Sequence, residues 1–297
     1  MVEPCLKEMD GEALRSQCYE LKRIFDQRAR ELGLGDLSHF FWYHTVDLGR
    51  GLVTPGTYDL RDTLASYGFP ESLDGKRVLD VGSATGFFAF ELEKRGADVT
   101  SVELPSIADL DVFPGETVDD IMKKMEGAFA YHSVYTPEQM DFLFRRCSRQ
   151  DFYHYFLDGP FLLCKAVLKS KVKRAYFTIY DLPNGFSRQA FDVVLLGDVL
   201  LHTINPVQAL AAAAQVCTGT LVLAQNMSCE RSDTPAMQYV GGTTRGAGIS
   251  WWFPTYACLE QILLKLGFKE VHIAGKHTSL VRPAGHTYQS VVVHAQR

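Results

Sequence analysis

The sequence lacks the cysteine patterns of disulfide-rich and zinc-binding proteins. Its 7 cysteines are odd in number and scattered, and they include no Cys-x-x-Cys pair. Neither a disulfide framework nor a structural zinc site is therefore predicted. We expect reduced thiols, no bound metal and a cytoplasmic location.

Long apolar runs are also missing. The longest helical run of apolar residues covers 207–216, far short of the roughly 20 residues that a membrane-spanning helix needs. The N-terminal stretch has no apolar core of the kind that a secretory signal needs, because it carries Glu3, Lys7, Glu8, Asp10 and Glu12. We therefore expect no membrane partner.

The chain has no excess of positive charge. Its 30 Lys and Arg residues against 35 Asp and Glu residues give a net charge of −5. Binding to RNA or DNA usually needs a dense basic surface that displaces counterions from phosphates. A nucleic-acid partner is disfavoured but not excluded, and the short basic run from Lys169 to Arg174 is interpreted as a solvated face.

What the sequence does contain is an alternation of strand-like and helical segments. Apolar, β-rich strands are predicted at 76–82, 98–103, 174–180, 191–197 and 218–225, in the pattern of parallel strands buried on both faces. Helices are predicted at 87–95, at 206–216 with Pro206 in the first turn, and at 255–266 before Gly267. Two closing strands follow at 270–274 and 287–295. This alternation predicts an α/β fold with a Rossmann-like, doubly wound sheet.

Two segments fall outside that alternation. Residues 1–75 contain an amphipathic helix at 12–32 and a Gly/aromatic stretch, and we predict that they form an N-terminal cap. Residues 107–171 are rich in aromatic side chains and are predicted to be a helical insertion in a domain that spans 76–297. Removing about 75 and about 65 residues from the chain leaves roughly 157, close to one domain of about 150. The insertion's aromatic residues are either its own core, a dimer surface or a substrate cage.

The chemistry is concentrated where the first strand runs into the next helix. Asp80-x-Gly82-x-x-x-Gly86 forms a turn with little side-chain bulk, so its backbone can approach a ligand, and Glu103 ends the neighbouring strand, where a carboxylate can hold a ribose diol. A dinucleotide site would place glycines where Ala84 and Phe87 stand, which disfavours a dehydrogenase. An acid two residues before the first glycine can meet a cationic amino group, which S-adenosylmethionine has and NAD lacks.

Together these motifs resemble the class I S-adenosylmethionine-dependent methyltransferases, from about residue 76 to the C-terminus. The residues that carry the likeness are Asp80, Gly82 and Gly86; Glu103; Asp181, Leu182 and Pro183; and the stretch 191–202, followed by Pro206, Ala209 and Leu210. The resemblance implies a seven-stranded sheet that ends in an antiparallel hairpin. It also implies transfer of the methyl group of S-adenosylmethionine to an O, N or C nucleophile of a small molecule, such as a secondary metabolite.

The resemblance also assigns roles to residues. Gly82, Ser83, Ala84 and Gly86 would cradle the amino-acid part of the cofactor, with Asp80 ordering that end. Glu103 would hold the ribose, and Asp181 with Leu182 the adenine. The full predicted cofactor set is Asp80, Gly82, Ser83, Ala84, Gly86, Phe87, Glu103, Leu104, Asp181, Leu182, Gly197 and Asp198.

His202 and His44 are the candidate catalytic bases, since a neutral imidazole can accept a proton near pH 7. Each could instead have a structural role. A base is not obligatory, because displacement at a sulfonium methyl group can gain most of its rate from orientation and desolvation.

A narrower likeness points to the subgroup that includes the tRNA wobble-uridine carboxymethyltransferase. It rests on the segments 42–44, 54–56, 200–202 and 251–255. The chain lacks the tryptophan-rich stretch of that enzyme before the first strand, and Leu201 stands where the enzyme has a tyrosine near its carboxylated cofactor. Ordinary S-adenosylmethionine and a small-molecule acceptor are therefore favoured. The alternatives are a wobble-uridine-type enzyme and a non-catalytic module with a vestigial pocket; a homodimer is compatible with each.

Overall fold

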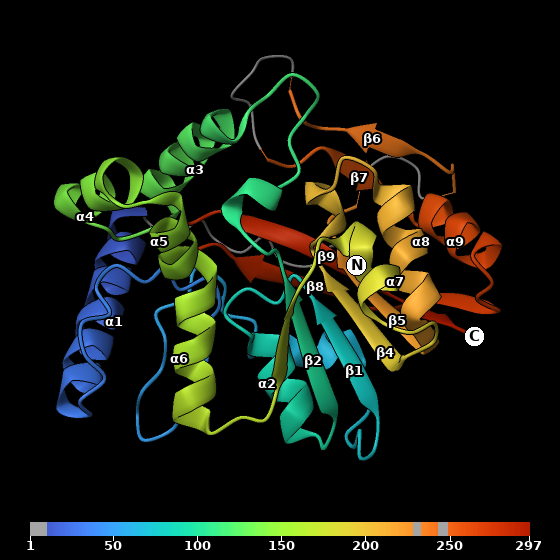
Figure 1. The fold of residues 1–297 in the computed structure, drawn as a ribbon, viewed down its shortest axis with the longest axis horizontal. Coiled ribbons are helices and arrows are strands. Elements are labelled where there is room, and N and C mark those ends of the chain that lie inside the picture. Colours follow the sequence, from blue (N-terminus) through green and yellow to red (C-terminus); the bar gives the residue numbers. More distant parts are fainter. Residues whose placement is uncertain (1–10, 228–232, 243–248) are drawn as a thin grey trace.

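The computed structural model describes residues 11–227, 233–242 and 249–297 and is built around one mixed sheet (Figure 1). Seven strands lie in the order β3-β2-β1-β4-β5-β9-β8. Strands β1 to β5 pair in parallel, and β9 is antiparallel to both β5 and β8. The strands are β1 (Arg77–Val81), β2 (Asp98–Glu103), β3 (Lys173–Tyr176), β4 (Phe191–Gly197), β5 (Cys217–Gln225), β8 (Glu270–Leu280) and β9 (Thr287–Gln296). The predicted Rossmann-like fold with a C-terminal antiparallel pair is confirmed.

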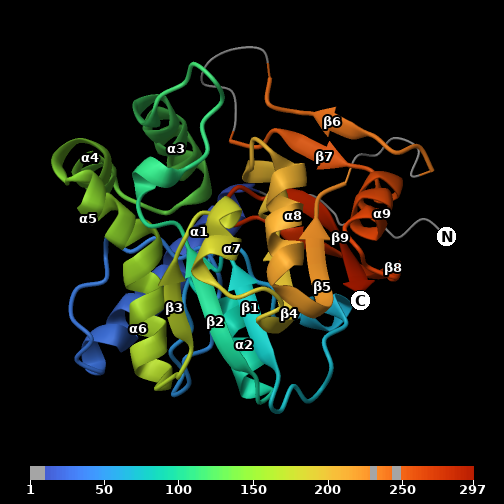
Figure 2. The same ribbon diagram turned by 45° about the vertical axis from the view of Figure 1, so that its right-hand side comes forward.

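The sheet is covered by helices on both faces, as Figures 1 and 2 show. On one face, buried residues of α2 (Phe87–Lys94) and α6 (Gly159–Leu168) share a core with the N-terminal segment. On the other face, α8 (Pro206–Val216) and α9 (Tyr256–Lys265) pack against β1, β4 and β5, and the short α7 (Leu182–Gly185) joins them. Burial of both faces explains why the central strands are apolar along their length.

Two strands end several residues away from the predicted position, whereas the other strand boundaries agree within one residue. Strand β3 ends at Tyr176, because the chain turns into the 3₁₀ segment Ile179–Asp181, whose Asp181 carboxylate accepts a hydrogen bond from the Thr178 hydroxyl at 2.6 Å. Strand β8 continues to Leu280 along the whole of β9, after a register shift between Ile273 and Gly275. The residues beyond this shift are largely polar, so their sequence does not indicate a strand. Backbone pairing with β9 holds them in the strand nevertheless.

The N-terminal segment lies against α2 and the carboxyl end of the sheet. Helix α1 (Gly11–Glu31) is followed by a chain that doubles back, so that Thr45 donates to Tyr58 and Thr57 donates to Trp42 through backbone hydrogen bonds of 2.8 and 2.9 Å. Gly56 lies at the contact: a Cβ there would be 2.1 Å from the backbone of His44. A glycine is therefore required for the two chain segments to meet. The cap boundary at residue 75 stays a prediction, and residues 1–10 lie outside the described residues.

The predicted insertion is helical. It contains α3 (Val118–His132), α4 (Pro137–Asp141), a π-helical turn (Phe142–Arg146), α5 (Arg149–Tyr153), a second π-helical turn (His154–Asp158) and α6. Most of its aromatic side chains form one cluster around Phe129 and Phe152, which Phe41 of the N-terminal segment completes. The rings therefore serve mainly as the core of the insertion.

A small hairpin lies at the same end of the molecule as α3 (Figures 1 and 2). It pairs β6 (Met237–Tyr239) with β7 (Trp252–Pro254) and was not anticipated from the sequence. Over the described ranges, no helix combines the length and the apolar character needed to cross a bilayer.

Candidate cofactor and acceptor site

A cavity of about 410 Å³ opens at the carboxyl ends of β1, β2 and β4, where ligands bind in doubly wound sheets. Its wall combines the sheet, the N-terminal segment, the insertion and the loop before β7. Nine predicted site residues line it: His44, Asp80, Gly82, Ala84, Glu103, Leu104, Gly197, Asp198 and His202. The fold thus brings together residues that are up to about 160 positions apart in the chain.

The turn after β1 has the predicted close-approach geometry. Gly82 has φ +68°, and a Cβ on it would be 2.8 Å from a methyl group of Val199. Ala84 also has positive φ, at +46°. Gly86 has φ +91° and a Cβ would lie 2.7 Å from the Phe161 and Phe90 rings, so helix α2 can begin only with a glycine at this N-cap. These backbone conformations are ones that L side chains rarely adopt.

A buried arginine supports the turn from behind and was missed in the sequence. Arg174 of β3 donates to the hydroxyls of Ser83 and Ser101 at 2.6 and 2.9 Å, and its guanidinium lies 4.1 Å from the centre of the Phe161 ring. Its side chain is only 4% exposed, so the prediction of a solvated face is wrong at this position. Lys169, Lys171 and Lys173 come before it in the sequence and are exposed. The run therefore gives no sign that its last cation is buried.

Two carboxyl groups lie next to the turn. Glu103 accepts hydrogen bonds from the backbone N–H groups of Ala84 and Leu104, both at 3.0 Å. Asp80 is 2% exposed, and within the described residues its Oδ2 atom has no hydrogen-bond partner. Burial, together with the neighbouring Glu103 charge, raises the pKa of Asp80 to about 7 although Arg174 lowers it. The cavity therefore presents a carboxyl group that would be stabilised by a cation.

The other predicted cofactor residues lie behind the cavity wall or beside it. Ser83, Gly86, Phe87 and Leu182 support the wall, with the Ser83 side chain turned to Arg174 and Phe87 packed in the core. Asp181 is exposed and bonds to Thr178 and Asn184. Its neighbours line the cavity instead, through Thr178, Ile179 and Tyr180. The sequence offered no signal to separate these adjacent positions.

The two candidate bases differ in their surroundings. His44 is buried among aromatic rings, and this desolvation lowers its pKa to about 3. The Nδ1 atom of His202 lies 2.8 Å from the carbonyl oxygen of Ile249. Because a carbonyl can only accept, Nδ1 carries the hydrogen and Nε2 keeps its lone pair. Burial also lowers the pKa of His202, but to a value that is not as extreme as that of His44. His202, with its lone pair at Nε2, is therefore the better placed of the two to accept a proton.

The sequence contains no sign of a hydrogen-bond network at the cavity wall that joins Asp111, Tyr180, Ile204 and Asn205, which we call the latch. The Tyr180 hydroxyl, after β3, donates to Asp111 of the insertion, and the backbone N–H of Ile204, after β4, donates to the same carboxylate oxygen at 2.8 Å. The backbone N–H of Asn205 in turn donates to the Tyr180 hydroxyl at 3.2 Å. One carboxylate therefore ties three loops together at the carboxyl edge of the sheet.

Replacing Tyr180 by Phe is expected to lower the free energy of unfolding by about 1–2 kcal/mol, because the Asp111 carboxylate and the Asn205 N–H each lose a partner. Urea unfolding would measure this. The same change at Tyr131, which is 53% exposed, should stay within about 0.5 kcal/mol. Equal losses for the two variants would contradict the latch.

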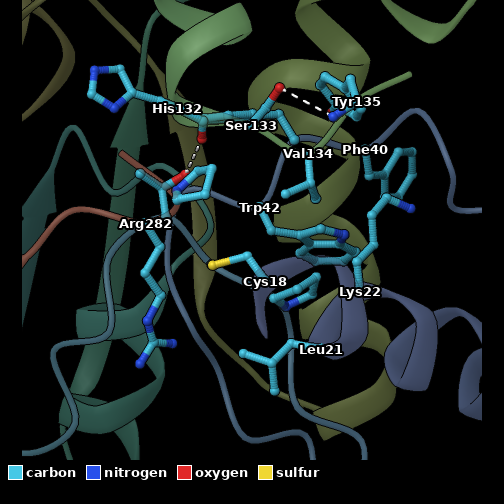
Figure 3. A pocket seen from close by; sticks show the side chains of 15 residues that line it. Cys18, Leu21, Lys22, Phe40, Trp42, His132, Ser133, Val134, Tyr135 and Arg282 are labelled. Atoms are coloured by element: carbon cyan, nitrogen blue, oxygen red, sulfur yellow. Dashed lines mark hydrogen bonds between the residues drawn. The ribbon is translucent and has the colours of Figure 1, made fainter. Parts of the chain in front are cut away.

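A second, much smaller cavity lies between α1, the insertion and Arg282 (Figure 3). Its volume of about 40 Å³ accommodates a few water molecules but no nucleoside. Trp42 Nε1 and His132 Nδ1 are buried and have no hydrogen-bond partner in the part of the chain that the structure describes. This space is a narrow gap between packed segments, and it is too small to be the ligand site.

Comparison with known proteins agrees with the fold. A family model described as a methyltransferase domain matches residues 56–273. The N-terminal domain of EvdMO1, crystallised with SAH bound, is 16% identical, with 99% of each chain covered and a TM-score of 0.50. Magnesium protoporphyrin IX methyltransferase (ChlM) from Synechocystis PCC 6803, with bound SAM, is 15% identical over 80% of this chain and 77% of that chain, with a TM-score of 0.44. No curated protein matches the sequence.

At this level of identity, the likeness to EvdMO1 shows the fold alone. The family model goes further, because it matches well over half of the 297 residues and spans the turn after β1, both neighbouring acids and the loop that carries His202. The chain therefore belongs to the methyltransferase-domain family.

Proposed function

We propose that the protein transfers the methyl group of S-adenosylmethionine to a small molecule bound in the large cavity. The observation that carries the proposal is the pair of acids beside the turn after β1. Among the residues that the structure describes, one carboxyl oxygen of buried Asp80 has no hydrogen-bond partner, and Glu103 lies at the end of the adjacent strand. A nucleoside that carries an ammonium group matches this pair, because one acid can bind the ammonium group and the other can bind the ribose hydroxyls.

The residues present fit that cofactor. Asp80 would pair with the ammonium group, and the backbone of the turn at Gly82 and Ala84 would lie against the amino-acid chain. Glu103 would accept from the ribose hydroxyls with the lone pairs that Ala84 and Leu104 leave free. For the adenine we favour Ile179 and Tyr180, which line the cavity, over the predicted Asp181.

The bound cofactor would supply a sulfonium methyl group that is open to in-line displacement. The protein's own contribution is to exclude water and to orient the acceptor. The insertion and the N-terminal segment contribute to the cavity wall, and His202 Nε2 can accept a proton from the acceptor. His44 is too weak a base at neutral pH for that role, given its lowered pKa, and would shape the wall.

A small-molecule acceptor is favoured by the cavity's charge. Its lining contains five acids, and within the described ranges no Lys or Arg: the acids are Asp80, Glu103, Asp109, Asp111 and Asp198. Such a wall disfavours the phosphates of a nucleic acid. The wobble-uridine subgroup, a homodimer and a cytoplasmic location stay predictions.

Isothermal titration with S-adenosylhomocysteine tests the proposal. We expect binding to the wild-type protein, and a dissociation constant raised roughly 10- to 100-fold for Glu103→Gln, because a hydrogen bond to a charged acceptor is worth about 1.5–3 kcal/mol. Asp62→Asn, at an exposed site, is the control and should bind like the wild type. Absence of binding to the folded wild-type protein would refute the proposal.

A further inference from the structure

A second buried acid lies in the same cavity, in a different setting from Asp80. Asp198 follows β4 with φ +50°, and burial raises its pKa to about 7. Its carboxyl group interacts, through its charge or through hydrogen bonds, with residues from four parts of the chain: Tyr43 and Tyr58 from the N-terminal segment, Tyr67 from the 3₁₀ turn Leu64–Tyr67, Asn226 after β5, and Tyr288 and Ser290 on β9. The fold thus brings residues from distant parts of the chain to one carboxyl group.

Three of these tyrosines form a continuous aromatic wall. The Tyr43 and Tyr58 ring centres are 4.7 Å apart, and those of Tyr58 and Tyr288 are 5.6 Å apart. All three rings line the cavity, as does Asp198. We call Asp198 with Tyr43, Tyr58 and Tyr288 the tyrosine cage.

The carboxyl group in the cage is weakly satisfied. The Ser290 hydroxyl donates to it at 3.3 and 3.4 Å, and the backbone of Asn226 supplies a further hydrogen bond. No Lys or Arg lines the cavity anywhere in the described parts of the chain, so the charge of Asp198 has no fixed counter-ion there. A buried carboxylate without a cation is costly, and a ligand that brings the cation removes that cost.

We propose that the tyrosine cage binds the acceptor as an organic ammonium ion and that the methylated atom is its nitrogen. Aromatic rings attract a cation over their faces, and the Asp198 carboxylate adds an ion pair. The proposal rests on the proposed function and narrows its acceptor to amines. A carboxylic acid or phosphate ester would be repelled, and a neutral alcohol would leave the carboxylate unpaired.

Methyl transfer to an amine needs one proton acceptor, which Asp198 supplies. For an amine acceptor Asp198 takes the place of His202 as the base. A proton passes from the ammonium group to the Asp198 carboxylate, and the freed lone pair on nitrogen forms a bond to the methyl carbon. The carbon–sulfur bond breaks, and its electron pair stays on sulfur to give the neutral thioether. The product is the N-methylammonium ion, and Asp198 returns its proton to solvent after release.

Titration of a model cation tests the cage. Benzyltrimethylammonium is titrated into protein saturated with S-adenosylhomocysteine, with benzyl alcohol as the neutral counterpart. We expect the ammonium ion to bind at least tenfold more tightly than the alcohol. Asp198→Asn should remove that preference when it is titrated at a concentration of S-adenosylhomocysteine that saturates the variant. Asparagine tolerates positive φ, so this variant keeps the backbone, and thermal unfolding would verify its fold.

Matched variants separate charge and ring effects. Asp62→Asn makes the same charge change on the surface and should keep the ammonium preference. Tyr58→Phe keeps the ring and should bind within about threefold of the wild type, whereas Tyr58→Leu should lose about five- to tenfold, since one cation–π contact is worth about 1 kcal/mol or more. The cage is refuted if the two benzyl compounds bind equally, or if Asp198→Asn and Asp62→Asn behave alike. Ammonium binding without S-adenosylhomocysteine binding would support the cage and refute the proposed function.

Discussion

Replacing Asp80 by Asn is expected to weaken S-adenosylhomocysteine binding about 100-fold or more while it stabilises the cofactor-free protein at alkaline pH. The affinity falls because a buried ammonium group would lose its only carboxylate partner, a loss worth about 3–5 kcal/mol. The stability rises because Asp80 is 2% exposed and its Oδ2 atom has no partner within the described residues. Function and stability thus make opposite demands on one residue.

The sign of the pH dependence follows from the raised pKa. Unfolded Asp80 ionises at its usual 3.8, whereas the folded protein holds the proton up to about pH 7, so the stability of the cofactor-free protein falls as pH rises between these values. Each pKa unit is about 1.4 kcal/mol, which makes the loss on the order of 4 kcal/mol. The asparagine of Asp80→Asn does not ionise, so the stability of that variant does not fall with pH for this reason.

Urea unfolding at pH 5 and pH 8.5 would measure this difference. We expect Asp80→Asn to exceed the wild type at pH 8.5 and to approach it at pH 5. Saturating S-adenosylhomocysteine should stabilise the wild type far more than the variant at pH 8.5. Asp80 does not have this role if the stability difference between Asp80→Asn and the wild type is the same at both pH values. The same conclusion follows if the variant binds S-adenosylhomocysteine with full affinity.

Replacing Gly56 by Ala is expected to lower the free energy of unfolding by about 3 kcal/mol or more. The added Cβ would lie 2.1 Å from backbone atoms of both His44 and Thr45, and backbone cannot move aside as a flexible side chain can. Relief would separate the two chain segments and break the hydrogen bonds that join Thr45 to Tyr58 and Thr57 to Trp42. Because His44 and Tyr58 line the cavity, ligand binding should fall as well.

Gly127→Ala is the matched control for this change. Gly127 is exposed within α3, and a Cβ there would meet nothing within 4 Å. In a helix interior this substitution should stabilise the protein by roughly 0.5–1 kcal/mol. Urea unfolding of both variants gives the comparison, and a Gly56→Ala protein as stable as the wild type would contradict the packing described for residues 42–58.

The turn after β1 could be predicted because its determinants are close together in sequence. Asp80, Gly82 and Gly86 occupy one strand-to-helix connection, and Glu103 ends the next strand, so their spacing alone predicts a shared edge of a parallel sheet. The helix 206–216 was likewise predicted with its observed bounds, since Pro206 at its start and the apolar pattern within it are local signals.

Other site features depend on contacts that no short stretch of sequence encodes. Arg174 lies in a basic run and is buried because β3 places it beneath Ser83. Asp111 is one acid among many in the insertion until the fold brings Tyr180 and Ile204 to it. The adenine contact at Asp181 stays a prediction, but the structure places Tyr180 in the cavity wall and leaves Asp181 exposed, and the sequence gives no signal for this one-residue difference.

By itself, the sequence determined the order of the strands and helices that build the main sheet, the glycine turn and the two acids beside it, because hydrophobic periodicity and short-range backbone geometry suffice for them. Only the tertiary structure decided which residues surround the end of the cavity where we propose that the acceptor binds. Tyr43, Tyr58, Asp198 and Tyr288 come together from segments as far apart as 43 and 288. Their meeting depends on how the N-terminal segment packs against the closing strands, and that packing is a property of the whole chain.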